Sequence, residues 1–183
     1  MGKLTVFTNI SLDGYFEGPG HDLSGFKNDF EAFPANPEQQ TGTLLFGHKT
    51  YEMMRFWKTP QAEEMAPAVA RYMNDTPKFA ASRQPFDPEW QNVTVISGDV
   101  PGEVRKLKEQ DGKDILILGS NELVVSLMQA GLVDELQIVV NPVALGQGTT
   151  LFKGLAGKTD FTLKSSRTFK SGAVMLTLEP VRD

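Results

Sequence analysis

Strand-like and helix-like segments alternate along this chain, and this alternation constrains its fold more than any other feature of the sequence. Runs rich in Val, Ile, Leu and Phe have the length and composition of strands. They cover residues 4–10, 43–46, 78–81, 93–96, 115–118 and 136–140. Helix-like patterns lie between most of them, at residues 29–33, 49–56, 62–73, 104–110 and 122–130. Because parallel strands need such crossovers, the pattern predicts a mainly parallel sheet with helices on both faces.

The strand-like runs differ between the middle of the chain and its C-terminal part. Ile115-Leu116-Ile117-Leu118 is apolar at every position, which is typical of a strand buried on both faces. Near the C-terminus, residues 161–169 and 173–178 flank Lys170-Ser171-Gly172, which indicates a hairpin. The sequence therefore predicts an α/β fold of three layers, with a mostly parallel central sheet and an antiparallel C-terminal hairpin at one edge.

Composition narrows the classes of function. A chain of 183 residues with 40% hydrophobic residues fits a single domain over residues 1–183. It has no Cys, and its N-terminus enters a strand-like run directly, so we expect a cytoplasmic protein without disulfides. No apolar run approaches the roughly 20 residues of a membrane span, and the net charge of −5 argues against nucleic acid as a partner. With only His21 and His48, far apart, we expect no metal site.

Three polar segments follow predicted strands and share a chemistry suited to phosphate. Gly47-His48-Lys49-Thr50 combines a strand-to-helix junction with a Lys and a hydroxyl. Gly119-Ser120-Asn121 offers close backbone approach and a helix N-terminus, and Ser82-Arg83 offers a hydroxyl and a planar cation for a ribose 2′-phosphate. Because ligands of open α/β sheets bind at the carboxyl ends of strands, together they indicate one phosphate-bearing cofactor.

Each segment also has an ordinary structural interpretation. Ser120, Asn121 and Thr50 can be helix caps, and Arg83 can be a solvated loop residue. The GxGxxG fingerprint is absent, and we interpret Gly146-Gln147-Gly148 as a loop. Asp134-Glu135 follows a predicted helix end, so we interpret it as a helix-to-strand connection and not as an acid/base pair.

The early part of the chain contains the candidate substrate residues. Asp13-Gly14 is a turn signal. Asp22, Phe26 and Phe30 have the i, i+4, i+8 spacing of one helix face, where a carboxylate and two rings can hold a heteroaromatic substrate. The alternative is a capping Asp with two core Phe residues, and Gly25 interrupts the helical pattern.

Six blocks of sequence, taken in order, resemble one family, the dihydrofolate reductase-like group that includes the reductase domain of the bifunctional riboflavin biosynthesis protein. The blocks are Ile10-Ser11-Leu12-Asp13-Gly14, Phe46-Gly47-His48-Lys49-Thr50-Tyr51-Glu52, Pro77-Lys78-Phe79-Ala80-Ala81-Ser82-Arg83, Ile117-Leu118-Gly119-Ser120, Gly131-Leu132-Val133-Asp134-Glu135-Leu136 and Asn141-Pro142-Val143-Ala144-Leu145-Gly146-Gln147-Gly148. They span nearly the whole chain. The resemblance implies a central mixed sheet and NADPH as hydride donor.

The resemblance also implies roles for individual residues. Gly47, Lys49 and Thr50 match the family's cofactor segment, Ser82-Arg83 the segment near the adenosine 2′-phosphate, and Gly119-Ser120-Asn121 the pyrophosphate turn. Ile10 would lie near the nicotinamide. Many members have two consecutive Gly at the pyrophosphate turn, whereas Ser120 stands at the second position here. Asp22 to Lys27 resembles the active-site segment of the folate enzymes, so Asp22 is the candidate proton donor or substrate anchor.

These observations predict an NADPH-dependent oxidoreductase that reduces a small heterocyclic metabolite, pterin-like or pyrimidine-like. One alternative is the reduction of 5-amino-6-(5-phosphoribosylamino)uracil in riboflavin biosynthesis, which needs a second phosphate clamp. Another is a non-catalytic nucleotide-binding protein on the same fold. The family and the edge of the hairpin also favour a homodimer, whose interface the sequence does not specify.

Overall fold

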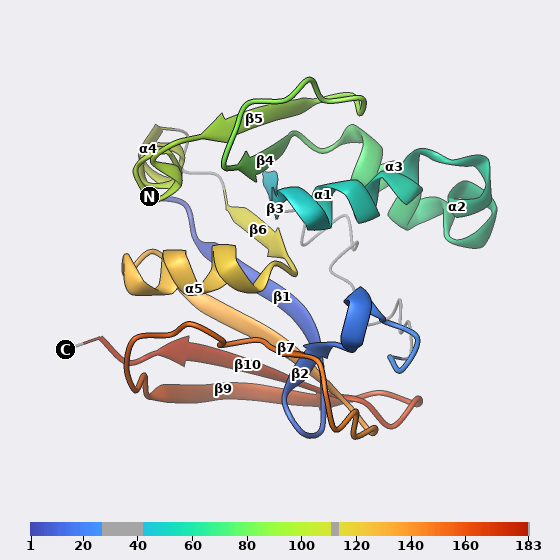
Figure 1. The fold of residues 1–183 in the computed structure, drawn as a ribbon, viewed down its shortest axis with the longest axis vertical. Coiled ribbons are helices and arrows are strands. Elements are labelled where there is room, and N and C mark those ends of the chain that lie inside the picture. Colours follow the sequence, from blue (N-terminus) through green and yellow to red (C-terminus); the bar gives the residue numbers. More distant parts are fainter. Residues whose placement is uncertain (27–41, 111–113, 183) are drawn as a thin grey trace.

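The computed structural model describes residues 1–26, 42–110 and 114–182, and in this part of the chain eight strands form one central sheet (Figure 1). Their order is β5-β4-β3-β6-β1-β7-β10-β9. Their bounds are β1 Leu4–Ser11, β3 Thr43–Gly47, β4 Lys78–Ser82, β5 Val93–Ser97, β6 Ile115–Leu118, β7 Glu135–Asn141, β9 Phe161–Thr168 and β10 Val174–Pro180. Neighbours from β5 to β7 are parallel, and β10 pairs antiparallel with β7 and β9. The predicted fold class is therefore confirmed.

Helices cover both faces of the sheet, which gives the three layers. The helices are α1 His48–Met54, α2 Pro60–Met65, α3 Pro67–Asp75, α4 Val100–Gln110 and α5 Asn121–Gln129. The central strand β6 shows how the layers are held together. Ile115 and Ile117 join a buried cluster with residues of α4 and α5, whereas Leu116 and Leu118 join a second cluster with residues of α1 and α3. Successive side chains of a strand point to opposite faces, so a fully apolar strand feeds both clusters.

The helical region after β3 differs from its prediction. We predicted one helix over 62–73, but α2 ends at Met65 and α3 begins at Pro67. Ala66 between them has a φ of −151° and a ψ of 77°, far from helical values. Proline lacks an amide hydrogen and disfavours a helical residue before it, so it starts a new helix here. The predicted helix over 29–33 lies outside the described residues.

The C-terminal hairpin turns through Gly172, whose φ of 86° suits glycine. The Phe169 N–H donates to the Ala173 carbonyl at 2.9 Å and closes the turn. Strand β9 is the outer strand of the sheet, and all its residues except Phe161 are exposed. The edge on which the homodimer prediction rests is therefore open in the monomer.

A second, two-stranded sheet lies beside the carboxyl end of β1 (Figure 1). It pairs β2 (Tyr15–Glu17) with β8 (Thr149–Thr150) in antiparallel orientation. Neither strand was predicted from the sequence, because segments of two or three residues carry no periodic pattern. The pairing holds the two loops that follow β1 and β7 against each other.

Candidate functional site

The three predicted phosphate segments lie at the same edge of the sheet. They follow β3, β4 and β6, which are adjacent and parallel in the order β4-β3-β6. Parallel neighbours bring their carboxyl ends together, with a spacing of about 4.8 Å between strands. The structure thus gathers Gly47, Ser82 and Gly119 at one place, although they are far apart in the sequence.

The hydroxyl of Ser120 joins two of these segments. Its Oγ accepts a hydrogen bond from the Gly47 N–H at 2.9 Å and lies 2.7 Å from Thr50 Oγ1, within hydrogen-bonding distance. A Cβ at Gly47 would lie 2.5 Å from the same oxygen, so only glycine fits there. Thr50 is buried. The turns after β3 and β6 are therefore coupled through one side chain.

Ser120 precedes α5, but it does not act as an ordinary cap. Its φ of 64° and ψ of 83° place it in the left-handed region, and its side chain makes no capping hydrogen bond to α5. Gly47 before α1 likewise provides no side-chain cap. In the described part of the chain, neither N-cap residue thus caps its helix through a side chain, and uncapped N-terminal N–H groups favour anions. Gly119, with a φ of 64°, lets the backbone turn between β6 and Ser120.

Asn121 has a structural role that the sequence did not reveal. Its side chain is buried, and its Nδ2 contacts the carbonyls of Thr150, Leu151 and Lys153 at 3.2, 2.6 and 3.2 Å. These contacts fix the segment after β8 against the start of α5. The side-chain amide of Asn121 is therefore occupied by contacts within the protein. The predicted contact between Asn121 and a cofactor stays a prediction, and it would be made by the backbone N–H.

The segment after β4 is connected to the first one through His48. Its Nδ1 lies 3.0 Å from Ser82 Oγ, and its ring stacks on Phe86 with centroids 4.5 Å apart and planes at 24°. From the sequence, His48 was assigned no role in the cofactor segment, and its contact with Ser82 was not predicted. The only feature of the sequence that pointed to a role for His48 was its position between Gly47 and Lys49. His48 is exposed and Phe86 is partly buried, so the free face of the His48 ring can stack against a flat base.

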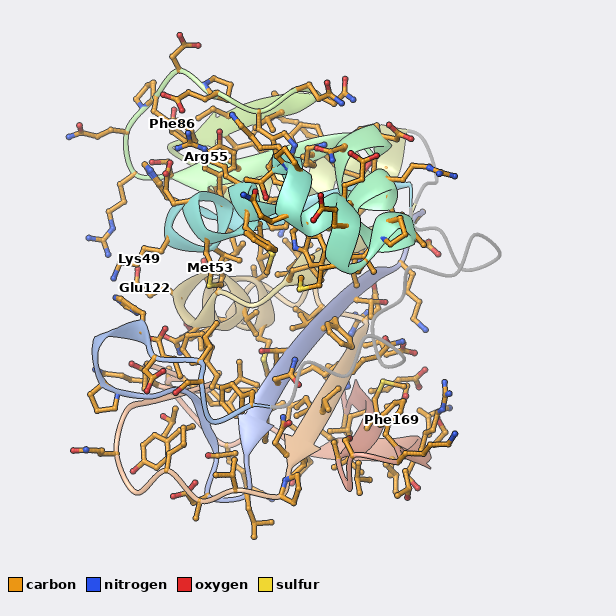
Figure 2. The ribbon with its side chains drawn as sticks, turned by 90° about the vertical axis from the view of Figure 1, so that its right-hand side faces the viewer. Lys49, Met53, Arg55, Phe86, Glu122 and Phe169 are labelled. Atoms are coloured by element: carbon orange, nitrogen blue, oxygen red, sulfur yellow. The ribbon has the colours of Figure 1, made fainter. Side chains whose placement is uncertain are left out.

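The cations of the site differ in their surroundings. Arg83 donates from Nη2 to Glu122 Oε2 at 3.0 Å, and both side chains are strongly exposed, at 89% and 79%. Among the described residues, none forms a hydrogen bond or ion pair with the exposed Lys49 ammonium. Figure 2 shows Lys49 and Glu122 on the same side of the molecule. Glu122 was not a predicted site residue, and its only sequence signal was an acid in the first turn of a helix.

The carboxyl end of β1 carries the predicted nicotinamide neighbour, Ile10, which is partly buried. Beyond it, Asp13 organises the loop. Its carboxylate accepts from Ser11 Oγ at 2.6 Å and from the N–H groups of Leu145 and Gly146 at 3.0 and 2.8 Å. The Ser11 hydroxyl and these two N–H groups lower the pKa of Asp13 to about 2. The prediction that Asp13 forms a turn is confirmed, and the same side chain anchors the loop after β7.

The predicted helix face at Asp22 and Phe26 is wrong. Asp22 forms an isolated bridge with Gly18, and residues 24–26 form a turn. Gly25 packs against Leu145 so closely that a Cβ there would lie 2.8 Å from Leu145 Cδ2. This contact and the bridge favour an irregular loop, which agrees with the interruption that Gly25 indicated. Phe30 lies outside the described residues.

Asp22 itself is exposed, and its Oδ1 accepts from the Ser24 N–H at 2.8 Å. This backbone hydrogen bond, with a contribution from the Ser24 side chain, lowers the pKa of Asp22. The group is therefore a carboxylate at neutral pH. That state suits binding of a substrate N–H group better than donation of a proton.

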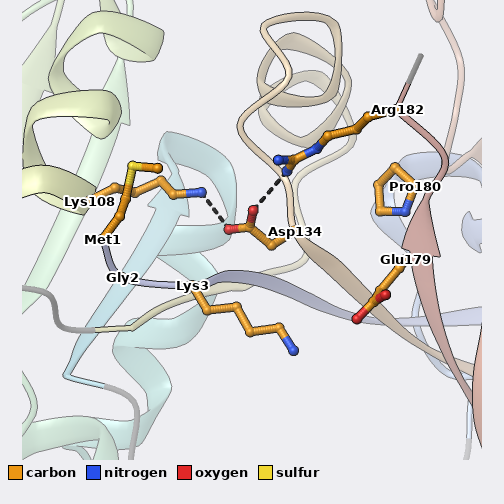
Figure 3. A pocket seen from close by; sticks show the side chains of 8 residues that line it. All are labelled: Met1, Gly2, Lys3, Lys108, Asp134, Glu179, Pro180 and Arg182. Carbon is orange, nitrogen blue, oxygen red and sulfur yellow. Dashed lines mark hydrogen bonds and ion pairs between the residues drawn. The ribbon is translucent and has the colours of Figure 1, made fainter.

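A separate cavity of about 500 Å³ lies at the amino ends of β1 and β7, and Figure 3 shows the side chains around it. It is lined by Met1, Gly2, Lys3, Lys108, Asp134, Glu179, Pro180 and Arg182. Asp134 accepts from Lys108, from Arg182 at 2.7 Å and from the Leu4 N–H at 2.7 Å. Burial by itself would raise the pKa of Asp134, but the hydrogen bonds from these donors lower it overall. The charges are paired with one another, and none of the predicted site residues lines the cavity. Asp134-Glu135 is the connection into β7, as predicted.

Residues 1–26, 42–110 and 114–182, which the structure describes, contain no group of three or more His, Asp or Glu side chains placed to hold a metal ion. None of the helices in them has the length and apolar character needed to cross a bilayer.

Comparison with known proteins places these observations in a family. Residues 2–175 match the model of the RibD C-terminal domain. Two relatives from Bacillus subtilis strain 168 are similar over most of their length. The uncharacterized protein YyaP is 27% identical over 168 residues, which are 91% of this chain and 89% of that protein. The uncharacterized protein YwjB is 29% identical over 170 residues, which are 91% of this chain and 92% of that protein.

Solved structures share the fold. A putative riboflavin biosynthesis protein from Shewanella sp. PV-4 has a TM-score of 0.76 at 20% identity, covering 98% of this chain and 99% of that one. Dihydrofolate reductase from Enterococcus faecalis, complexed with NADP(H), has a TM-score of 0.67 at 15% identity, covering 99% and 98%. The deaminase/5-amino-6-(5-phosphoribosylamino)uracil reductase of Thermotoga maritima has a TM-score of 0.71 at 14% identity, and this chain matches 57% of its length.

The overall fold agrees with these solved structures, and the family model spans nearly all of the sequence. The chain belongs to the RibD C-terminal domain family, whose fold is dihydrofolate reductase-like.

Proposed function

We propose that this protein is an NADPH-dependent reductase of a small heterocyclic metabolite, pterin-like or pyrimidine-like. The observation that carries the proposal is the Ser120 hydroxyl bound to the Gly47 N–H and next to Thr50. It holds two uncapped helix N-termini side by side, as a pyrophosphate needs. Family membership supports a reductase, and the dihydrofolate reductase of the same fold is named as a complex with NADP(H).

The residues present fit such a cofactor. The backbone N–H groups after Gly47 and Gly119 and the ammonium of Lys49 would hold the phosphates of the pyrophosphate. Ser82 and Arg83 would contact the 2′-phosphate, and Ile10 would lie beside the nicotinamide. When bound, NADPH would supply a hydride.

The chain's own groups then determine what is reduced. The hydride and one proton from an ordered water would convert a polarised C=N or C=O to its reduced form. We propose that the Asp22 carboxylate orients the substrate by accepting from its N–H groups. Phe26 is partly buried in the same loop and would face the substrate ring. Replacing Asp22 by Asn should then raise KM more than it lowers kcat, and unchanged turnover and affinity would exclude the role.

Cofactor binding is the first test. NADPH should raise the melting temperature of the protein more than NADH at the same concentration, because only the former has the 2′-phosphate. A shift with neither nucleotide would refute the cofactor proposal. Oxidation of NADPH against a panel of pterins, pyrimidines and quinones would then separate a reductase from a non-catalytic nucleotide-binding protein.

Family membership favours a second candidate substrate, 5-amino-6-(5-phosphoribosylamino)uracil. That substrate carries its own phosphate, which calls for a cation near the end of β1. Residues 12–26 and 142–150, which form the two loops there, contain no Lys or Arg. Turnover of this compound, compared with its dephosphorylated form, tests the candidate. A strong preference for the phosphorylated form would support it over the general reductase.

A further inference from the structure

The Arg83–Glu122 ion pair crosses the candidate cofactor site. Arg83 follows β4, and Glu122 lies in the first turn of α5, which follows β6. Strand β3 lies between β4 and β6, so the pair spans the carboxyl end of β3. Two strand spacings are about 9.6 Å, a distance that only two long side chains can bridge. The pair therefore passes over the turn that begins at Gly47.

Stability of the fold does not explain this pair. With exposures of 89% and 79%, the two side chains are solvated, and such pairs contribute little to folding. An acid in the first turn of a helix is favourable by itself, without a partner from another strand. What the pair does change is the state of Arg83, which is held by a carboxylate at the place proposed for the 2′-phosphate.

The Arg83–Glu122 pair affects how the site selects between a 2′-phosphate and a 2′-hydroxyl. Arg83 contacts Glu122 directly, and Lys49 extends on the same side of the molecule. A 2′-phosphate must compete with the Glu122 carboxylate for the Arg83 guanidinium. A ribose 2′-hydroxyl, in contrast, can donate to a carboxylate.

We infer that Glu122 is a specificity-determining residue: by holding Arg83, it weakens the preference of this site for NADPH over NADH. The inference rests on the proposed function, because it concerns the same cofactor site. Because Glu122 lies in the first turn of α5, its charge also acts on the pyrophosphate that both nucleotides share, so its specific effect is on the ratio of the two affinities.

Binding of both nucleotides to Glu122→Gln, measured by isothermal titration calorimetry, tests this. We expect the dissociation constant of NADH divided by that of NADPH to rise roughly two- to fivefold relative to the unaltered protein, the range of one exposed ion pair. The rise should shrink at high salt, because the groups are exposed. An unchanged ratio of the two dissociation constants, or an equal change in both, would overturn the inference.

Glu179→Gln is the matched control. Glu179 forms an exposed ion pair with Lys164 at 3.2 Å at the opposite edge of the sheet, and its loss removes the same charge. It should leave the ratio unchanged, and a ratio that shifts as in Glu122→Gln would overturn the inference by showing an effect of net charge. If the unaltered protein binds neither nucleotide, the proposed function fails and the inference fails with it. Binding of NADPH with an unchanged ratio removes the inference alone.

The route through Arg83 is tested in an Arg83→Gln background. Without the guanidinium, Glu122→Gln should give less than half of its rise in this ratio. A rise of full size in that background would show that Glu122 acts by direct repulsion, which would overturn the assigned route.

Discussion

Replacing Ser120 by Ala tests whether one hydroxyl couples the two turns of the site. The substitution removes the hydrogen bond from the Gly47 N–H and the contact with Thr50 Oγ1 while keeping the backbone. Two such interactions are worth about 1–3 kcal/mol in total. The left-handed backbone at φ 64° remains strained for Ala. For a chain of this size, each kcal/mol lowers the melting temperature by roughly 2–4 °C.

Two further variants sharpen the test. Ser120→Gly loses the same two interactions but relieves about 1 kcal/mol of left-handed strain, so it should be more stable than the Ala variant. Thr50→Val removes the contact from the other side. Because the two residues share one interaction, the double variant Ser120→Ala/Thr50→Val should be less destabilised than the sum of the single variants.

Urea unfolding at neutral pH measures the free energy of unfolding of each of these variants. Ser165→Ala, at an exposed position on β9, is the control and should stay within about 0.5 kcal/mol of the unaltered protein. If Ser120→Ala behaves like this control, or if the double variant equals the sum of the single variants, the coupling we describe is absent. Either result would contradict the geometry of the turn and leave the cofactor proposal untouched.

Three further predictions concern groups that support the site. Asp13 has a lower pKa in the folded protein than in the unfolded chain, so its contribution to stability is present above about pH 4 and is lost as pH falls through about 2. Asp13→Asn should flatten the fall of the urea midpoint between those values, and equal slopes would contradict this. Lys78→Met should destabilise by about 2–4 kcal/mol, because the buried Nζ donates to the Met73, Asn74 and Thr76 carbonyls at 2.9, 3.1 and 2.7 Å. A loss below about 0.5 kcal/mol in chemical denaturation would show that these carbonyls find other donors. Asn121→Ala should destabilise by about 1–3 kcal/mol and speed amide exchange at residues 149–153, whereas unchanged exchange would mean that other contacts hold this segment.

The sheet was predictable because its strands differ in local pattern from everything around them. Each predicted strand from β1 to β7 lies within two residues of the observed one at either end, since runs of Val, Ile and Leu bounded by turn residues carry their own limits. Where local signals conflicted, prediction failed. Pro67 lies inside a helical pattern of apolar residues, but the proline ends one helix and starts another.

The structure of the loops after β1 and β7 was not predictable from the sequence. Their strands β2 and β8 are short, and Asp13 and Asn121 hold segments that are distant in the sequence. No local pattern reports such contacts, because hydrogen bonds from one side chain to a remote backbone leave no periodic trace. The helical spacing of Asp22 and Phe26 was misleading for the same reason, since Gly25 packs on Leu145.

The sequence by itself determined the class of fold, the position of three polar segments after strands and the resemblance to the reductase family. These depend on local composition and spacing. Only the tertiary structure decided how the three segments are connected, through the Ser120 hydroxyl, through His48 beside Ser82 and through Arg83 paired with Glu122. The reason is physical: strand order places β3 between β4 and β6, and contacts across strands depend on that order and not on neighbours in the chain.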